Sequence, residues 1–95
     1  MENQHRKITG YRDLDQAEID LMNEVKQLGI AQEATLKKVE EHIFNQRGEN
    51  AGIYQETVKQ RMDNATPERF LALAKTEFQT GLMYATRAVA QPEFF

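Results

Sequence analysis

The feature that most constrains this chain is a helical pattern over residues 15–44, which is too long for a compact domain of 95 residues. At 1.5 Å per residue, about 30 residues make a helix about 45 Å long, whereas a compact sphere of this chain length is roughly 32 Å across. Apolar residues mostly three or four apart define the pattern: Ile19, Met22, Val25, Gly29, Leu36, Val39 and Ile43. Such a helix would protrude from a compact monomer, so we expect its apolar stripe to pack on another copy.

Local signals mark where this helix begins. Asp15 followed by Glu18 is an acidic variant of the capping box, and Leu14 with Ile19 has the spacing of a hydrophobic staple. We therefore expect the helix to start near residue 15, after a lead-in over residues 1–14. Gly29 weakens the middle of the helix, where it would permit a bend.

The rest of the chain predicts two more helices. The glycine-rich stretch 45–52 reads as a connector, and residues 53–64 carry a shorter helical pattern. Thr66 is the expected N-cap of a helix over residues 67–90, with Pro67 at the first helical position and Pro92 ending it before a tail over residues 91–95. This helix carries an apolar stripe, and it also contains Gly81, a residue small enough to let a partner helix approach closely. The prediction is one all-α domain over residues 1–95, built from a long, a short and a long helix.

Composition narrows the classes of partner. A formal net charge of −3 disfavours a protein that coats DNA or RNA polymers, because phosphate backbones are held mainly by excess lysine and arginine. The first residues do not resemble a signal peptide, and no apolar run is long enough to span a membrane. With no cysteine, the chain is consistent with a reducing cytoplasm. A local positive patch suited to a small anion is present near the N-terminus: His5, Arg6, Lys7 and Arg12.

Catalytic and metal chemistry are poorly supported. The chain has no cysteine or serine nucleophile to pair with its two histidines, His5 and His42. Glu40 and Glu41 adjoin His42, but not at the Glu-x-x-His spacing of di-iron helix bundles. The glycines of the connector lack the lysine of a phosphate-binding loop, and residues 53–64 are not basic enough for a DNA-recognition helix. We therefore expect a protein that is not an enzyme and has no metal or cofactor.

The residues around the start of the long helix are candidates for a binding site. Tyr11 offers an aromatic face on which a base can stack, while Arg12 and Lys26 offer cations for phosphate. Gly10 adjoins this group. These are ordinary residue types, so the alternative is a tyrosine that covers the core and a solvated lysine.

The runs "TGYRDLDQAEIDLMNEVKQLG" and "TPERFLALAKTEFQTGLMYATRAVAQP" resemble the phage anti-CBASS type 2 protein family, which sequesters cyclic nucleotide signals of bacterial immunity. The resemblance implies helical protomers that form dimers and then a hexamer, with cyclic dinucleotides such as 3′,3′-cGAMP held between paired protomers. It assigns base stacking to Tyr11 and a phosphate contact to Lys26. It also implies a separate pocket for cyclic trinucleotides, with Arg69 as the candidate arginine.

The resulting hypothesis is a cytoplasmic protein of an infected bacterium that binds a cyclic nucleotide signal without cleaving it. A 3′,3′-cyclic dinucleotide has approximate two-fold symmetry, so a symmetric dimer can meet each half of the ligand with the same residues. The alternative is a helical structural or partner-binding protein, such as an inhibitor of a host enzyme, in which Tyr11 and Lys26 belong to a protein interface.

Overall fold

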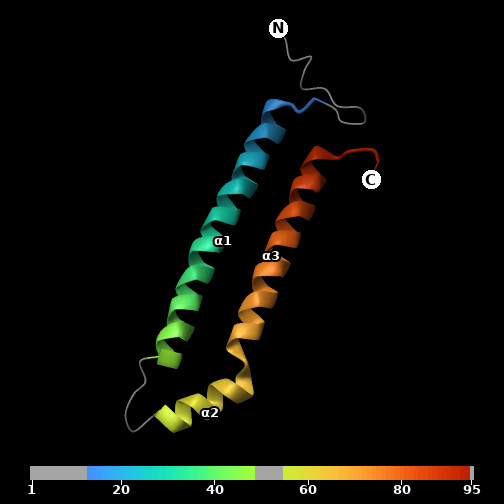
Figure 1. Ribbon diagram of the computed structural model, residues 1–95. Coiled ribbons are helices and arrows are strands. Elements are labelled where there is room, and N and C mark those ends of the chain that lie inside the picture. The colour runs from blue at the N-terminus through green and yellow to red at the C-terminus, as the bar shows by residue number, and fades with distance from the viewer. Residues whose placement is uncertain (1–12, 49–54, 95) are drawn as a thin grey trace.

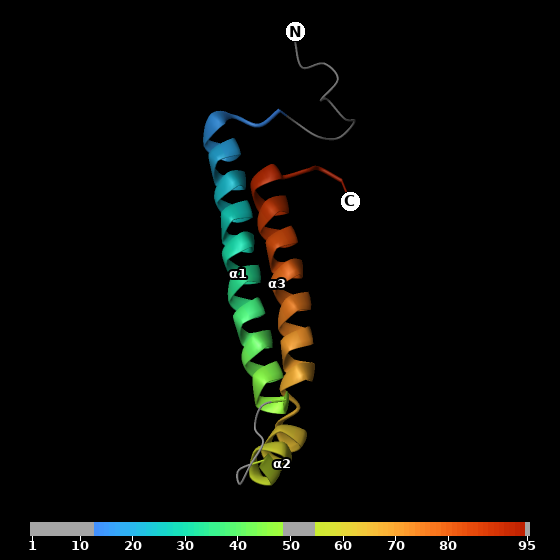
Figure 2. The same ribbon diagram turned by 60° about the vertical axis from the view of Figure 1, so that its left-hand side comes forward.

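The computed structural model describes residues 13–48 and 55–94, which form three helices and no strand. These are α1 (Gln16–Gly48), α2 (Gln55–Ala65) and α3 (Pro67–Ala90). The long helices α1 and α3 run antiparallel and side by side, and the short α2 lies at the end where the hairpin turns (Figures 1 and 2). The all-α class and the order of long, short and long helices are therefore confirmed.

Reciprocal hydrogen bonds of a capping box begin α1. The backbone N–H of Glu18 donates to Asp15 Oδ1 at 2.8 Å, and the backbone N–H of Asp15 donates to Glu18 Oε1 at 2.9 Å. Two N–H groups that have no partner within the helix are thereby satisfied. The expected start of the helix near residue 15 is confirmed.

The end of α1 differs from the expectation. The helix ends at Gly48, four residues beyond the predicted end at residue 44, so part of the expected connector is helical. It also continues unbroken through Gly29. A Cβ atom placed on Gly29 would lie 2.9 Å from Leu82 Cδ1, which is closer than an ordinary van der Waals contact. Gly29 therefore allows close approach of α1 to α3 and does not interrupt the helix.

Thr66 stands at the N-cap position of α3, as predicted, but its side chain does not cap the helix. Its side chain makes no cap hydrogen bond to α3, and its hydroxyl instead donates to the Ala65 carbonyl at 2.7 Å. Thr66 adopts a left-handed backbone, with φ 48°, and its N–H donates to the Met62 carbonyl at 2.8 Å. Thr66 thus ends α2 in the manner of a left-handed C-cap. This conformation is incompatible with the extended backbone that a side-chain N-cap needs. The predicted bounds of α3 coincide with those observed.

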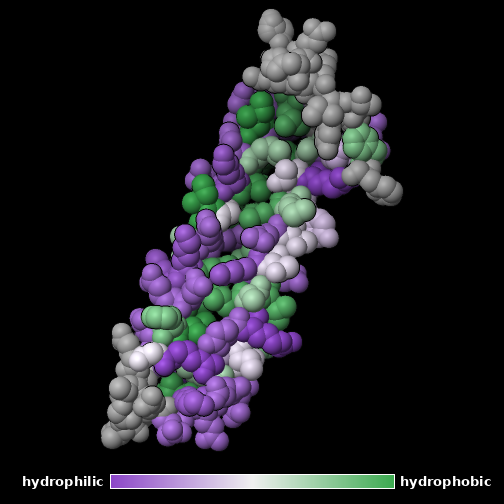
Figure 3. All heavy atoms as spheres, in the orientation of Figure 1, coloured by the Kyte–Doolittle hydropathy of each residue, from purple (hydrophilic) through white to green (hydrophobic). Residues whose placement is uncertain are grey.

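The fold is elongated and has little buried core. The molecule measures 67 × 23 × 20 Å, with a radius of gyration of 20.5 Å, whereas a compact chain of this length has a radius of about 12 Å. Ile43 and Met62 are the buried hydrophobic residues among those described, at 7% and 2% exposure. On the face shown in Figure 3, hydrophobic residues follow the seam between α1 and α3. The long helix is therefore covered along one side by α3, while much of its apolar surface remains exposed.

No helix in residues 13–48 or 55–94 is both long enough and apolar enough to cross a lipid bilayer.

Candidate functional site

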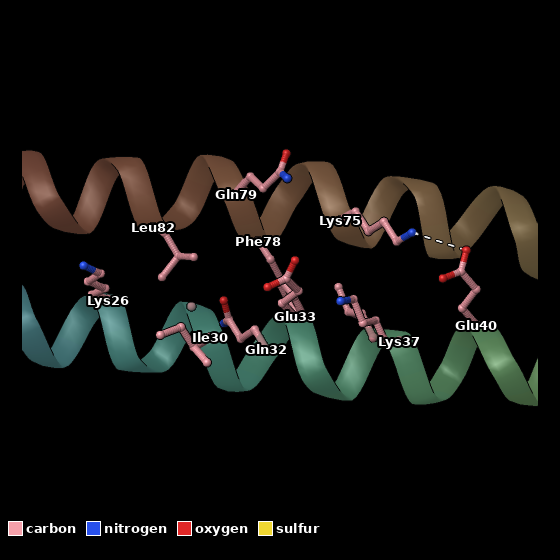
Figure 4. A pocket seen from close by; sticks show the side chains of 12 residues that line it. Lys26, Ile30, Gln32, Glu33, Lys37, Glu40, Lys75, Phe78, Gln79 and Leu82 are labelled. Atoms are coloured by element: carbon pink, nitrogen blue, oxygen red, sulfur yellow. Dashed lines mark ion pairs between the residues drawn. The ribbon is translucent and has the colours of Figure 1, made fainter.

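A groove of about 450 Å³ runs along the seam of the hairpin, with Lys26 at one end (Figure 4). Apolar parts of its wall come from both long helices: Gly29, Ile30 and Leu36 of α1, and Phe78 and Leu82 of α3. Polar side chains also line the groove: Lys26, Gln32, Glu33, Lys37, Glu40, Lys75 and Gln79. The groove thus combines an apolar surface with several cations, which suits a ligand that has both flat apolar parts and negative charges.

Lys26 has no carboxylate partner among the described residues, whereas a lysine at the other end of the groove does have one. There, Lys75 Nζ lies 3.7 Å from Glu40 Oε2 (Figure 4). Lys26 is exposed and also lines a second hollow of about 440 Å³, together with Gly29, Leu82 and four other residues. Its ammonium group is therefore available to an anion that enters either hollow.

Three of the predicted site residues, Gly10, Tyr11 and Arg12, lie outside the residues that the structure describes. Their relation to Lys26 stays a prediction. The capping box at Asp15 shows where the described chain enters α1, and Lys26 lies 11 residues further along, about 16 Å at the rise of an α-helix.

Arg69 lies near the opposite end of the hairpin from Lys26, in the first turn of α3. Its guanidinium carbon is 5.2 Å from the centroid of the Phe70 ring, a cation–π distance. Arg69 is exposed and has no carboxylate partner within the described part of the chain. Lys26 shares a hollow with Met83, which is 14 residues beyond Arg69 on α3, or about 21 Å along the helix. The structure therefore does not bring the two predicted cations together in one site.

A cluster of ion pairs around Arg47 joins all three helices, and sequence reasoning missed it. Arg47 Nε and Nη2 donate to the two carboxylate oxygens of Glu68 at 2.7 and 3.0 Å, and Nη1 donates to Asp63 Oδ1 at 2.8 Å. Lys59 Nζ lies 2.9 Å from Asp63 Oδ2. The partners of Arg47 are 16 and 21 residues away in sequence, so no local pattern could identify them.

The charges of this cluster shift one another's pKa values. The hydrogen bond from Arg47 is the main cause that lowers the pKa of Glu68, and the bond from Lys59 is the main cause that lowers the pKa of Asp63. Conversely, the pKa of Arg47 is raised mainly by Glu68, and the pKa of Lys59 mainly by Asp63. All four groups are thus held in their charged forms at neutral pH.

Gln32 is a second residue that the sequence patterns did not reveal. Its amide oxygen Oε1 is buried in the seam and has no hydrogen-bond partner among the described residues. In Figure 4 the side chain points from α1 toward α3. An amide atom in this position is costly, because burial removes water without supplying a donor in exchange.

Comparison with known proteins shows similarity both to a family model and to a curated protein. The family model described as "Acb2/Tad1, hairpin domain" matches residues 3–90. The chain is also 41% identical over 110 aligned positions to "Anti-CBASS protein 2" of Pseudomonas phage JBD67, and the match covers 98% of each chain.

Proposed function

The chain belongs to the Acb2/Tad1 hairpin-domain family, and we propose that it acts against CBASS immunity by binding and sequestering cyclic dinucleotides. The relative's name, Anti-CBASS protein 2, supports the first part of this proposal. The proposed ligand is a 3′,3′-cyclic dinucleotide such as 3′,3′-cGAMP, bound in the cytoplasm of an infected bacterium. The ligand is held and not cleaved.

The observation that carries the proposal is the ammonium group of Lys26, which has no carboxylate partner in the described part of the chain and lies beside two hollows at the α1–α3 seam. A phosphate contact by this lysine would be charge-assisted, and such contacts are about twice as strong as neutral hydrogen bonds. Tyr11 would supply base stacking, which contributes about 1–3 kcal/mol per base. Gly10 and Arg12 complete the proposed site.

Self-association belongs to the same proposal. The chain exposes 7862 Å², which is about 2,200 Å² more than a compact monomer of its mass exposes. An excess of this size on one chain is larger than the roughly 600–1,000 Å² that each partner buries in a standard protein–protein interface. Large apolar side chains that would gain from burial include Met83 and Tyr84, both 68% exposed. Paired protomers would supply two copies of Tyr11 and Lys26 to one two-fold ligand, and three such dimers would form the proposed hexamer.

Arg69 is proposed to contact phosphate in a second pocket, which takes cyclic trinucleotides. The support for this proposal is that the Arg69 guanidinium is exposed and has no carboxylate partner in the described residues. Arg69 also lies far along α3 from the hollow that Lys26 lines. The separation of the two cations predicts that the two kinds of ligand bind independently.

Recovery of the ligand tests sequestration directly. Excess protein is incubated with 3′,3′-cGAMP until no free ligand is detected, and the protein is then denatured by heat and the supernatant analysed by chromatography. Sequestration predicts that intact cyclic dinucleotide returns in nearly full yield. Linear dinucleotide would instead indicate hydrolysis, and failure to deplete the ligand would favour a helical partner-binding protein.

A further inference from the structure

Five charged side chains gather where the three helices meet, and they are not equivalent. Arg47 of α1, Lys59 and Asp63 of α2, and Glu68 of α3 form a connected set of ion pairs. Arg69, the next residue after Glu68, takes part in none of them and instead lies over the exposed ring of Phe70.

The charge balance of this set determines what an anion near Arg69 would experience. Two cations and two carboxylates cancel, so this set does not offset the positive charge of Arg69, which has no carboxylate partner among residues 13–48 and 55–94. Removal of Arg47 would leave the set with one net negative charge and would deprive Glu68 of the two hydrogen bonds that it accepts from the guanidinium. A carboxylate adjoining Arg69 in sequence would then oppose the binding of any anion there.

Arg47 also fixes the geometry of the first turn of α3. Its two parallel bonds to Glu68 hold the carboxylate in one orientation, because a guanidinium and a carboxylate match as planar forks. Glu68 is thereby directed toward the end of α1. A lysine could supply the charge of Arg47 but not this paired geometry.

We propose that Arg47 is a positioning residue for an anion site at Arg69: it neutralises and orients Glu68, so that the Arg69 guanidinium is available to phosphate. This inference rests on the trinucleotide part of the proposed function. The ligand class is a cyclic trinucleotide, whose phosphates carry the negative charge that Arg69 would meet.

Calorimetry with cyclic tri-adenosine monophosphate tests the proposal on the full-length oligomer. We expect Arg47→Met to weaken binding by about 10-fold or more, the scale of one charge-assisted contact. The double variant Arg47→Met with Glu68→Gln should regain most of the lost affinity, because it removes the carboxylate that Arg47 neutralises. Arg47→Lys should fall between the wild type and Arg47→Met.

The rescue separates this role from a purely structural one, since Glu68→Gln cannot restore the lost contacts of Arg47. Binding of 3′,3′-cGAMP, measured in parallel, should be unchanged in every variant. If Arg47→Met does not fold, Glu68→Gln alone tests the proposed role of Arg47. We expect Glu68→Gln to bind the trinucleotide at least as tightly as the wild type.

Three results from the variants would overturn the inference: undiminished binding by Arg47→Met, no recovery in the double variant, or weaker binding by Glu68→Gln. If the wild type binds 3′,3′-cGAMP but not the trinucleotide, the proposed second site fails, and this inference fails with it. If the wild type binds neither ligand, the proposed function as a whole is wrong.

Discussion

Leu82 Cδ1 lies 2.9 Å from the point where a Cβ atom of residue 29 would stand, so α1 and α3 approach each other at Gly29 as closely as their side chains permit. Gly29→Val should therefore lower the free energy of unfolding by about 1–3 kcal/mol through overpacking. Urea denaturation would measure the loss. In a Leu82→Ala background, the cost of the valine should shrink, because the atom that it displaces is gone. Equal costs in both backgrounds would show that the contact does not limit the approach.

Gln32 should be a site where a less polar side chain stabilises the protein. Gln32→Met keeps the length of the side chain and removes the amide oxygen that has no partner in the described residues. Relief of a buried, unsatisfied polar group should raise the free energy of unfolding by about 1–3 kcal/mol. The matched control is Gln27→Met, at an exposed position of α1, which should change stability little. A destabilised Gln32→Met protein would indicate that the amide has a partner in the assembled protein.

Local chemistry made part of this fold predictable. The capping box at Asp15 needs only residues 15–18, and the bounds of α3 follow from Pro67 and Pro92. The end of α1 could not be predicted, because its last turn contains Arg47, whose ion partners belong to other helices. The left-handed backbone of Thr66 could likewise not be predicted, because this single residue joins the end of α2 to the start of α3.

The candidate site also has features that the local sequence predicts and features that only the packing of the helices reveals. The sequence identified Lys26 as a cation inside the long helix, and the structure adds that it borders two hollows formed with α3. The walls of those hollows come from residues that are about 50 positions apart, such as Gly29 and Leu82, so only the packed hairpin reveals them. The ion pairs of Arg47 with Asp63 and Glu68 also depend on this long-range packing.

Acid should weaken the wild type more than the variant Arg47→Met, in which Glu68 loses its ion pair and Asp63 keeps only Lys59. The pKa values of Asp63 and Glu68 are lowered in the folded protein, so their contribution to stability is full above their unfolded pKa values, about 4. That contribution is lost as the pH falls through the lowered folded values. Thermal melts should therefore show wild type and Arg47→Met well separated at neutral pH and closer together in acid. A separation that does not narrow in acid would contradict the role of the carboxylates.

Assembly should depend on the outward face of α3. Light scattering should report a mass well above 11.0 kDa, and we expect six copies. Apart from its chain neighbours and the nearby backbone of α3, no atom lies within 4 Å of a Cβ built on Gly81, so a larger side chain there is compatible with the hairpin itself. Gly81→Leu should nevertheless reduce the oligomer if a partner helix packs closely at this point. A helical Gly81→Leu protein of unchanged mass would place the interface elsewhere, and a wild-type monomer at micromolar concentration would contradict the assembly.

Lys26→Ala should weaken the binding of 3′,3′-cGAMP by about 10-fold or more, because it removes a charge-assisted contact of about 1.5–3 kcal/mol at a two-fold site. Tyr11→Ala should also weaken binding, through the loss of base stacking. The matched control for the lysine is Lys38→Ala, which makes the same change of charge at an exposed position of α1 that lines neither hollow. Calorimetry should therefore show a deficit for Lys26→Ala and Tyr11→Ala and near wild-type affinity for Lys38→Ala, with helicity and oligomer size unchanged in all three. Equal affinities for Lys26→Ala and Lys38→Ala would mean that the ammonium group beside the hollows is only solvated, and Tyr11 alone could then not explain tight binding of a doubly charged ligand.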